Sequence, residues 1–390
     1  MNKRIMISAG EASGDMHAAS FVRALHQLDP SIEIYGMGSS QLEQAGADLL
    51  IDCADIAVVG LVEVLVNYRR ILKALNTLRD ALRKNPPDLL VLVDYQEFNF
   101  KLAETAHQLG IKVLFYISPQ VWAWRQHRVH KIGKIIDMMA VILPFEEKFY
   151  LDANVPVRFV GNPLVDKVKP DKSREDCFRE YELDAGRRVI GLFPGSRRSE
   201  IKRILPLQLA AAEQLISRKP GLQFIIPVAR SLNKDIFIPY LSRYERLNIV
   251  LTDDLSYNVM QCCDSIIAAS GTATLEIGLM GIPNCITYKV ASLSYFILKQ
   301  LVKIPYLGLV NIISEKQVVR EFIQFDTRAE DIADEIIRTL DDEDYRNIMI
   351  DELKKVREKL GKTGGSENMA QLILEMLEKP SNSKPLSAGE

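Results

Sequence analysis

The sequence has few of the features that mark secreted, membrane-spanning or nucleic-acid-binding proteins. Its 390 residues include only five cysteines, an odd number without a Cys-x-x-Cys pair, which argues against a disulfide framework. No apolar run is as long as a membrane-spanning helix, and the apolar start of the chain is broken too early for a secretory signal. A formal net charge of -2 gives no support to general nucleic-acid binding. We therefore expect a cytoplasmic protein with no nucleic-acid partner.

The common nucleotide and metal motifs are also missing. The sequence contains neither the Gly-x-Gly-x-x-Gly dinucleotide fingerprint nor a phosphate loop ending in Gly-Lys-Ser or Gly-Lys-Thr. It has no convincing Asp-x-Asp metal motif. His127 and His130 are close in sequence, but no third ligand is evident, so surface histidines are the preferred interpretation. We predict no metal and no cofactor.

Short apolar runs alternate with helical patterns along most of the chain. With 47% hydrophobic and 26% charged residues, the chain can bury substantial cores and is predicted to form two domains. The alternation predicts an α/β fold with parallel sheets covered by helices. The predicted strands are 4–9, 33–36, 89–93, 113–117, 138–143, 158–160, 189–193, 223–227, 248–251, one starting at Ser265, and 284–288. The predicted parts are a domain at 1–165, a linker at 166–187, a domain at 188–342, closing helices at 343–378 and a disordered tail at 379–390.

Residues 265–281 contain the most informative turn of the chain. A short apolar run leads through Ser270 and Gly271 into a helical pattern, which predicts a strand-to-helix turn. The free N–H groups at such a helix start bind anions, and Gly271 lets a phosphate approach closely. A carboxylate at Glu276 suits the hydroxyls of a sugar, so the pair suggests a nucleotide. The alternative is a capped helix in which Glu276 only complements the helix dipole.

A second candidate anion site follows the predicted strand 189–193. The turn Pro194-Gly195-Ser196-Arg197 places a hydroxyl and a guanidinium just after a buried strand. Ser196 can donate to a phosphate oxygen, and Arg197 can bind a diphosphate through two charged hydrogen bonds. We prefer this interpretation to a solvated charged turn, because all the donors point to the ligand edge of a sheet.

Asp94 directly follows the apolar run 89–93, at the carboxyl end of a predicted central strand. Ligands bind at that edge in open α/β sheets. A carboxylate near the apolar Tyr95 and Phe98 suits proton abstraction from a hydroxyl. The alternative is an aspartate that caps the next helix, and Glu97 and Asn99 are other candidates for the base.

The loop 118–125 contains both tryptophans of the chain. Trp122 and Trp124, flanked by Arg125, can line a substrate cleft and orient a bulky sugar or acyl group. The same rings can instead wedge a helix onto the sheet.

The segment 57–82 is unlike an ordinary surface helix. Its first part is almost wholly apolar, and an apolar face then continues beside basic residues, which is typical of helices lying at a membrane interface. Burial in the domain or a homodimer interface is the alternative. A similar mixture at 288–306 strengthens the membrane interpretation. The predicted membrane patch is Val62, Leu65, Arg69, Leu72, Lys73 and Leu75.

Four motifs together resemble the lipid-A-disaccharide synthases, a family of membrane-associated glycosyltransferases. Each motif is weak evidence alone, but their order and spacing are specific, and the resemblance extends from Ile5 to about Leu377. The motifs are Gly-Glu-Ala-Ser-Gly-Asp at 10–15, Ser-Pro-Gln-Val-Trp-Ala-Trp-Arg at 118–125, Pro-Gly-Ser-Arg at 194–197 and Ser-Gly-Thr-Ala-Thr-Leu-Glu at 270–276.

The resemblance implies a GT-B fold, in which two Rossmann-like domains face each other across a cleft. The first domain would bind the acceptor and face the inner membrane, and the second domain would bind the UDP-sugar. The implied reaction moves 2,3-diacylglucosamine from its UDP derivative to the 6-hydroxyl of 2,3-diacylglucosamine 1-phosphate. Its products, UDP and a β-1,6-linked disaccharide 1-phosphate, belong to lipid A biosynthesis in Gram-negative bacteria. The donor is α-linked, so the transfer is inverting and needs one base.

The resemblance also implies roles for individual residues. Asp94 would take the acceptor proton, and Arg197, with Ser196 and the helix start near Thr272, would stabilise the departing UDP. Glu276 would hold the ribose. Hydrogen-bond donors of the protein, and not a metal ion, would neutralise the charge of the diphosphate. Loss of activity in EDTA would therefore contradict this mechanism. The remaining residues implied for the UDP site are Ser13, Gly271, Thr274, Asn311, Glu321 and Gln324.

Two alternatives of different classes stay open. Another GT-B enzyme with a lipid-linked acceptor would share UDP binding and membrane contact, but should lack this double-tryptophan loop. A nucleotide-binding peripheral membrane protein without catalysis would bind UDP and show no dependence on Asp94.

Overall fold

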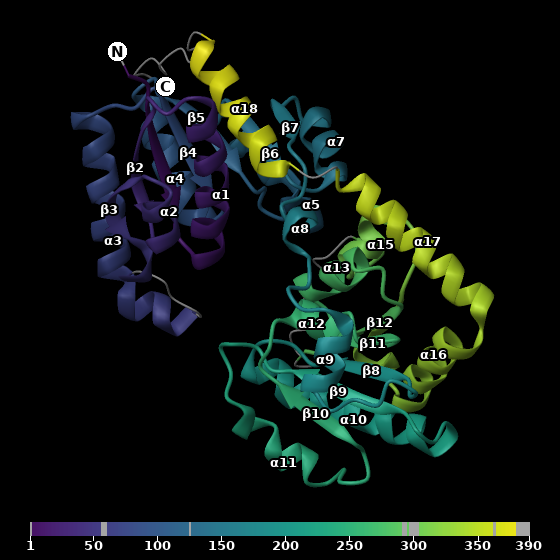
Figure 1. Cartoon of the computed structure of the whole chain (residues 1–390). Helices are drawn as coiled ribbons and strands as arrows, with labels where there is room; N and C mark the ends of the chain where they lie inside the picture. Colours follow the sequence, from purple (N-terminus) through teal and green to yellow (C-terminus); the bar gives the residue numbers. More distant parts are fainter. Residues whose placement is uncertain are drawn as a thin grey trace. The chain divides into compact units, whose positions relative to one another are not determined.

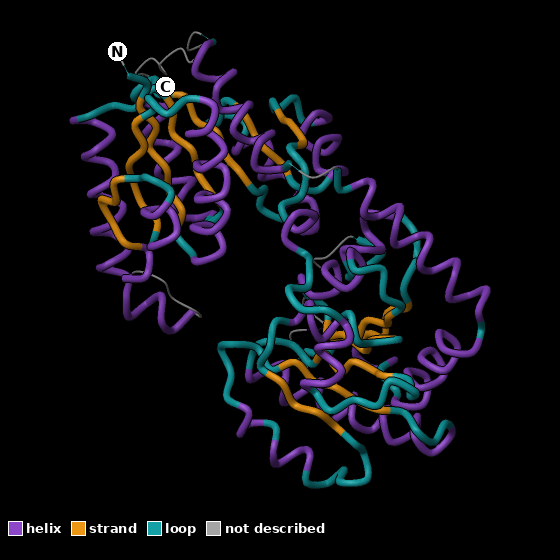
Figure 2. The backbone as a smooth tube through the Cα atoms, viewed as in Figure 1, coloured by secondary structure: helices purple, strands orange, loops and turns teal. Residues whose placement is uncertain are grey.

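The computed structural model describes residues 2–55, 61–124, 126–290, 295, 304–361 and 364–379, without the side chains of 55 and 61–67. The chain forms two compact units, each shown in Figures 1 and 2. Unit 1 contains Met1–Pro163 and Gly361–Glu390, and unit 2 contains Leu164–Leu360. The last helix, α18 (Gly365–Glu378), therefore belongs to the unit that holds the N-terminus. The predicted tail from 380 onward lies outside the described residues.

Unit 1 is built on a parallel sheet of seven strands in the order β3-β2-β1-β4-β5-β6-β7. The strand order reverses direction between β1 and β4, which creates a switch point where ligands bind in such sheets. The strands are β1 (Arg4–Ala9), β2 (Glu33–Gly38), β3 (Asp48–Asp52), β4 (Leu89–Val93), β5 (Lys112–Tyr116), β6 (Met138–Val141) and β7 (Val157–Phe159).

Helices cover both faces of this sheet, as a parallel sheet requires. On one face, α1 (Ala12–Leu28) and α18 pack side by side, and their apolar side chains form one core with β1 and β4. The opposite core contains side chains of α3 (Leu61–Lys84) and α4 (Gln96–Gln108). The shorter helices are α2 (Ser40–Gln44), α5 (Val121–Trp124), α6 (Val129–Ile132) and α7 (Pro144–Asp152).

Unit 2 contains a six-stranded parallel sheet in the order β10-β9-β8-β11-β12-β13. Renumbered from its own first strand, this is the Rossmann order 3-2-1-4-5-6, with its switch point between β8 and β11. The strands are β8 (Val189–Phe193), β9 (Gln223–Pro227), β10 (Ile249–Thr252), β11 (Ser265–Ala269), β12 (Asn284–Tyr288) and β13 (Arg320–Ile323).

The helices of unit 2 also lie on both faces of its sheet. The core of one face joins α10 (Arg198–Arg218) and α16 (Ala329–Asp341), while α17 (Glu343–Lys359) packs against α13 (Thr272–Leu279) and α15 (Leu309–Ser314). The predicted fold class of two parallel α/β domains is confirmed. The other helices in the described part of unit 2 are α8 (Leu164–Lys167), α9 (Arg174–Glu180), α11 (Ile238–Leu241) and α12 (Ser256–Met260).

Within the described part of the chain, no helix has the length and apolar character needed to cross a bilayer. All five cysteines are buried and free.

Candidate active site

The switch point of unit 2 brings together two of the predicted motifs. β8 and β11 are parallel neighbours, and Phe193 lies opposite Ala268 near their carboxyl ends. The turn 194–197 leaves β8 and the turn 270–274 leaves β11, so both turns lie at one edge of the sheet. Between them is a cavity of about 490 Å³. The cavity is lined by Phe193, Pro194, Gly195, Ser196, Arg197, Glu200, Pro227, Val228, Ala229, Arg230, Asp254, Leu255, Ser256, Ala269, Ser270, Gly271, Thr272, Ala273 and Glu276.

Glu200 holds the turn before α10 in shape. Its Oε2 accepts hydrogen bonds from the backbone N–H groups of Ser196 at 2.8 Å and Arg197 at 3.2 Å, and its Oε1 pairs with the Arg197 guanidinium at 3.1 Å. Gly195 has φ 108°, and a Cβ there would lie 2.3 Å from the Glu200 carboxylate, so only glycine fits. The Arg197 side chain remains 72% exposed, which leaves its other N–H groups available to a ligand.

The second turn is fixed by Thr274. This side chain is fully buried and its hydroxyl donates to the Gly271 carbonyl at 2.7 Å, so Thr274 shapes the turn. Gly271 and Thr272 are exposed, and a Cβ on Gly271 would meet no atom within 4 Å. Glu276 lies in the second turn of α13, where its carboxylate lines the cavity and accepts a hydrogen bond from the Tyr257 hydroxyl at 2.7 Å. The carboxylate therefore has a specific orientation.

Three other predicted nucleotide residues hold loops next to β12 and β13, and they are not among the residues that line this cavity. Asn311 donates to the Glu321 carboxylate at 2.7 Å, and that carboxylate also accepts the N–H of Gly308 at 2.9 Å. Gln324 makes two hydrogen bonds of 3.1 Å to the backbone of Val290. These bonds fix the segments that follow β12 and precede α15.

Arg230 is a cation of this cavity that the sequence analysis missed. It follows β9 by a few residues, its side chain is exposed, and it makes no ion pair with any described residue. A basic residue just after the carboxyl end of a predicted strand was the available signal.

The switch point of unit 1 places Asp94 beside the first motif. Ala9 and Val93 are opposite each other where β1 and β4 end, so Gly10 and Asp94 leave the sheet together. A Cβ on Gly10 would lie 2.1 Å from the Tyr95 ring, which explains why this motif begins with glycine. Ser13 is exposed in the first turn of α1.

Asp94 and Tyr95 have an unusual backbone. Both have φ 47°, a left-handed conformation that costs non-glycine residues free energy and is concentrated at functional sites. The buried Asn99 side chain supports this bend, because its amide donates to the Asp94 carbonyl at 2.7 Å and its oxygen accepts from Ser8 at 2.7 Å. Tyr95 occupies the N-cap position of α4, so Asp94 lies before the helix. Asn99 is thus a structural support.

Asp94 opens into a largely apolar cavity of about 460 Å³. Burial and the nearby Glu11 carboxylate raise the pKa of Asp94 above its ordinary value of 3.8. Such a group is a stronger base once ionised. Glu97, the other candidate, is exposed and pairs with Arg128 at 2.8 Å. The lining residues are Glu11, Tyr68, Ile71, Leu72, Leu75, Asp94, Tyr95, Gln96, Glu97, Phe98 and Lys101.

The tryptophan loop is anchored in the protein interior by Trp122. Trp122 is buried, its indole N–H donates to Glu146 at 3.1 Å, and its ring meets Phe145 edge-on with centroids 4.9 Å apart. Trp124 is 45% exposed. The structure therefore gives the two rings different roles, one in packing and one at the surface. Arg125 lies outside the described residues.

Glu146 should make stability depend on pH. Burial raises its pKa from 4.5 to about 8. Between pH 5 and 8 the folded protein therefore keeps a proton that the unfolded chain has released, so this group lowers the free energy of unfolding as pH rises, by up to about 1.4 kcal/mol per pH unit. Urea unfolding at pH 5 and pH 8 should show that the free energy of unfolding falls more for the wild type than for Glu146→Gln, which cannot ionise. Equal losses would refute this.

The predicted membrane patch lies on α3 and is only partly described. The side chains of Val62 and Leu65 lie outside the described residues. Arg69 and Lys73 are exposed, and Leu72 is half-buried beside the Asp94 cavity. Leu75 is a correction to the prediction, because it is buried in the core against the sheet and has too little exposed surface for lipid. Most of the second patch, at 291–294 and 296–303, lies outside the described residues.

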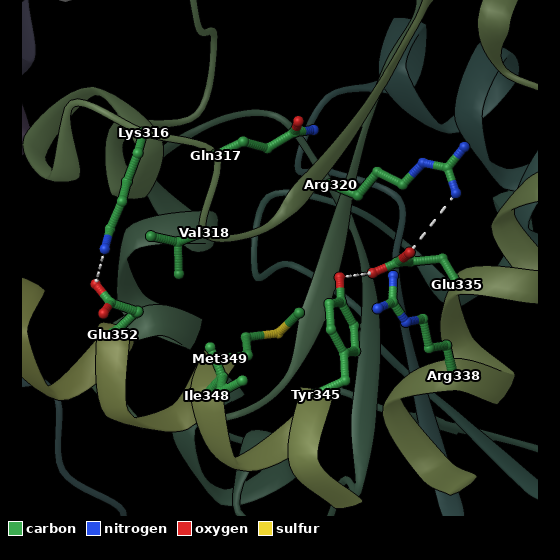
Figure 3. Close-up of a pocket in the computed structure, with 10 residues that line it drawn as sticks. All are labelled: Lys316, Gln317, Val318, Arg320, Glu335, Arg338, Tyr345, Ile348, Met349 and Glu352. Atoms are coloured by element: carbon green, nitrogen blue, oxygen red, sulfur yellow. Dashed lines mark hydrogen bonds and ion pairs between the residues drawn. The ribbon is translucent and has the colours of Figure 1, made fainter. Parts of the chain in front are cut away.

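A further cavity of unit 2, of about 420 Å³, lies at the amino end of β13 beside α16 and α17 (Figure 3). Its charged groups already pair with each other. Lys316 meets Glu352 at 2.7 Å, Arg320 meets Glu335 at 3.7 Å, and the Tyr345 hydroxyl donates to Glu335 at 2.6 Å. A ligand would have to displace these pairs, and the cavity is at the edge opposite the ligand edge of the sheet. We therefore place the site at the switch points.

Among the described side chains, no group of three or more His, Cys, Asp or Glu residues is placed to hold a metal ion.

Comparisons with known sequences match one enzyme family over nearly the whole chain. The family described as lipid-A-disaccharide synthetase matches residues 5–376. The lipid-A-disaccharide synthase of Geobacter sulfurreducens is 50% identical over 376 residues, which cover 96% of this chain and 98% of that protein. The enzyme of the same name from Nitrosococcus oceani is 46% identical over 374 residues, covering 96% of each.

Solved structures share the fold at low identity. The UDP-GlcNAc 2-epimerase of Neisseria meningitidis, bound to UDP-GlcNAc, superposes with a TM-score of 0.64 at 14% identity, over 96% of this chain and all of that one. The calicheamicin glycosyltransferase superposes with a TM-score of 0.59 at 14% identity, over 96% and 98% of the two chains.

Proposed function

The chain belongs to the lipid-A-disaccharide synthetase family of glycosyltransferases, and from this premise we propose its substrates, site residues and membrane contact. The donor is UDP-2,3-diacylglucosamine, and the acceptor is the 6-hydroxyl of 2,3-diacylglucosamine 1-phosphate. The products are the β-1,6-linked disaccharide 1-phosphate and UDP. The observation that carries this proposal is the match of residues 5–376 to one enzyme family, with a cavity at the ligand edge of each sheet.

In this mechanism Asp94 acts as the general base. Its carboxylate takes the proton of the acceptor hydroxyl while that oxygen attacks the anomeric carbon of the donor sugar. The apolar walls around Asp94 suit an acylated acceptor and keep water from competing as a nucleophile. Attack on the face opposite UDP converts the α-linked donor into a β-linked product.

The second unit holds the leaving group. Arg197, Ser196 and the start of α13 at Thr272 face the cavity where we place the diphosphate, and they stabilise its growing charge as the glycosidic bond breaks. Glu276 accepts hydrogen bonds from the ribose hydroxyls. As the family resemblance implies, we also assign Ser13, Gly271, Thr274, Asn311, Glu321 and Gln324 to the nucleotide site. Of these, Thr274, Asn311, Glu321 and Gln324 hold turns or loops of unit 2 through their hydrogen bonds. We place Trp124 and Arg125 at the sugar, and the buried Trp122 supports their loop through its contacts with Glu146 and Phe145.

The reaction can be tested with purified protein and both substrates in detergent. Mass spectrometry should detect the disaccharide 1-phosphate, with one UDP released for each product molecule. UDP release without disaccharide would instead indicate hydrolysis of the donor, and binding without release would indicate a non-catalytic nucleotide protein.

We further propose that the protein binds peripherally to the inner membrane through α3. Replacing Arg69 and Lys73 by glutamine should lower partitioning to vesicles of phosphatidylglycerol and phosphatidylcholine roughly thirtyfold, since each cation near an anionic surface contributes about 1 kcal/mol. The matched control replaces Lys354 and Lys355 on α17, two exposed lysines of the other unit. Equal partitioning of both variants and the wild type would refute a membrane contact on α3.

A further inference from the structure

Glu276 is held by a residue that no motif contains. Tyr257 lies in α12, which follows β10, whereas Glu276 lies in α13, which follows β11. The phenol hydroxyl of Tyr257 donates to Glu276 Oε1 at 2.7 Å, and its ring is buried. Burial is the main cause of a raised pKa at Tyr257, and the hydrogen bond to Glu276 raises this pKa further. The phenol therefore keeps its proton and acts as the donor.

The support is itself rigid. Asn258, the next residue of α12, is fully buried and ties the helix to the segment before α9: its side-chain oxygen accepts the N–H of Asp171 at 3.0 Å, and its amide donates to the Asp171 carboxylate at 2.6 Å. A phenol on such an anchored helix can fix the rotamer of Glu276. The carboxylate is thereby pre-oriented before any ligand arrives.

The hydrogen bond from Tyr257 leaves the Glu276 carboxylate able to accept further hydrogen bonds from a ligand in the cavity. A carboxylate has about four lone-pair positions, and Tyr257 takes one of those on Oε1. Oε2 of Glu276 has no hydrogen-bond donor among the described residues, and Glu276 lines the cavity. A neutral phenol also orients the carboxylate without adding a cation that would compete for its remaining lone pairs.

We propose that Tyr257 is a positioning residue that selects ribonucleotides, because it orients Glu276 to accept hydrogen bonds from both hydroxyls of the ribose. This inference rests on the proposed function, since it assumes that UDP occupies the cavity of unit 2. Tyr257 does not touch the reacting atoms, so its loss should raise KM for the UDP-sugar and leave kcat largely unchanged.

The test compares the binding of UDP and 2′-deoxy-UDP by calorimetry. Wild type should prefer UDP by about tenfold, the worth of one well-placed hydrogen bond to a charged group. In Tyr257→Phe this preference should fall to about twofold, because a freely rotating Glu276 loses the advantage of pre-orientation. In a Glu276→Ala background, Tyr257→Phe should change the preference no further.

Tyr345→Phe is the matched control. Tyr345 donates to Glu335 at 2.6 Å, a bond of the same kind in the same unit that lies in the separate cavity of Figure 3. It should keep the wild-type preference and thereby separate a general loss of stability from a loss of ribose selection. If Tyr257→Phe does not fold, Tyr257→His, which keeps a ring donor, should retain a preference for UDP above twofold.

Two negative outcomes are distinguishable. If the wild type prefers UDP and Tyr257→Phe keeps the full preference, the positioning role is wrong and the proposed function stands. If the wild type binds neither nucleotide, the proposed UDP site fails, and the inference fails with it.

Discussion

Replacing Asp94 by asparagine should slow disaccharide formation about 10²- to 10⁴-fold, the usual contribution of a general base. Asparagine keeps the size of the side chain and cannot accept the proton. UDP binding should be unchanged, because Asp94 does not line the cavity in which we place the diphosphate. Initial rates and UDP calorimetry on one folded preparation would check both expectations. A variant of wild-type rate would remove Asp94 from the mechanism.

The pH dependence of transfer gives a second readout of the same base. Asp94 is active only when ionised, so kcat/KM should fall as pH drops through its raised pKa. Burial is the largest cause of that raised pKa and Glu11 adds to it. Glu11→Gln removes the repulsion, lowers the pKa of Asp94 and should move the acid limb to lower pH. If the acid side of the pH profile of kcat/KM stayed at the same pH or moved to higher pH, this assignment would be contradicted.

Replacing Arg197 by alanine should lower kcat/KM for the donor about 10²- to 10³-fold, as expected for a group that stabilises developing charge. The change should have little effect on folding, because the Arg197 side chain is 72% exposed and ion pairs of exposed side chains contribute little to stability. Steady-state kinetics with thermal unfolding as a control would measure the two effects separately.

Arg197→Lys distinguishes charge from geometry. Lysine keeps the positive charge but loses the planar fork that binds two phosphate oxygens at once, so we expect an intermediate rate. If lysine restored full activity, charge alone would suffice. If alanine changed only the thermal stability, Arg197 would be structural, and Arg230, the other cation lining the cavity, would be the candidate for the diphosphate.

Most buried strands could be predicted closely from the sequence, whereas two of the edge strands could not. The predicted strands at Leu89–Val93, Val189–Phe193 and Asn284–Tyr288 match β4, β8 and β12 at both ends, because central parallel strands are continuous apolar or small-residue runs. Two strands that were not predicted are β3 (Asp48–Asp52) and β13 (Arg320–Ile323). Both lie at sheet edges and carry exposed charged residues, so they lack that signature.

The same limit applies to the site. The turns after β4, β8 and β11 were recognisable because small, polar or charged residues directly follow apolar runs. The supports of these turns come from other elements: Asn99 bonds to the Asp94 carbonyl from within α4, and Tyr257 reaches Glu276 from α12. Such contacts depend on how strands and helices are placed in space, and a linear pattern does not contain that information.

Inverting transfer without a metal should be visible in the linkage of the product and in its yield when divalent metals are chelated. Purified protein would be incubated in EDTA with UDP-2,3-diacylglucosamine and 2,3-diacylglucosamine 1-phosphate, and the disaccharide would be examined by proton NMR. We predict a β-1,6 linkage and undiminished yield. An α-linked product, or activity that appears only when a divalent metal is restored, would contradict the mechanism.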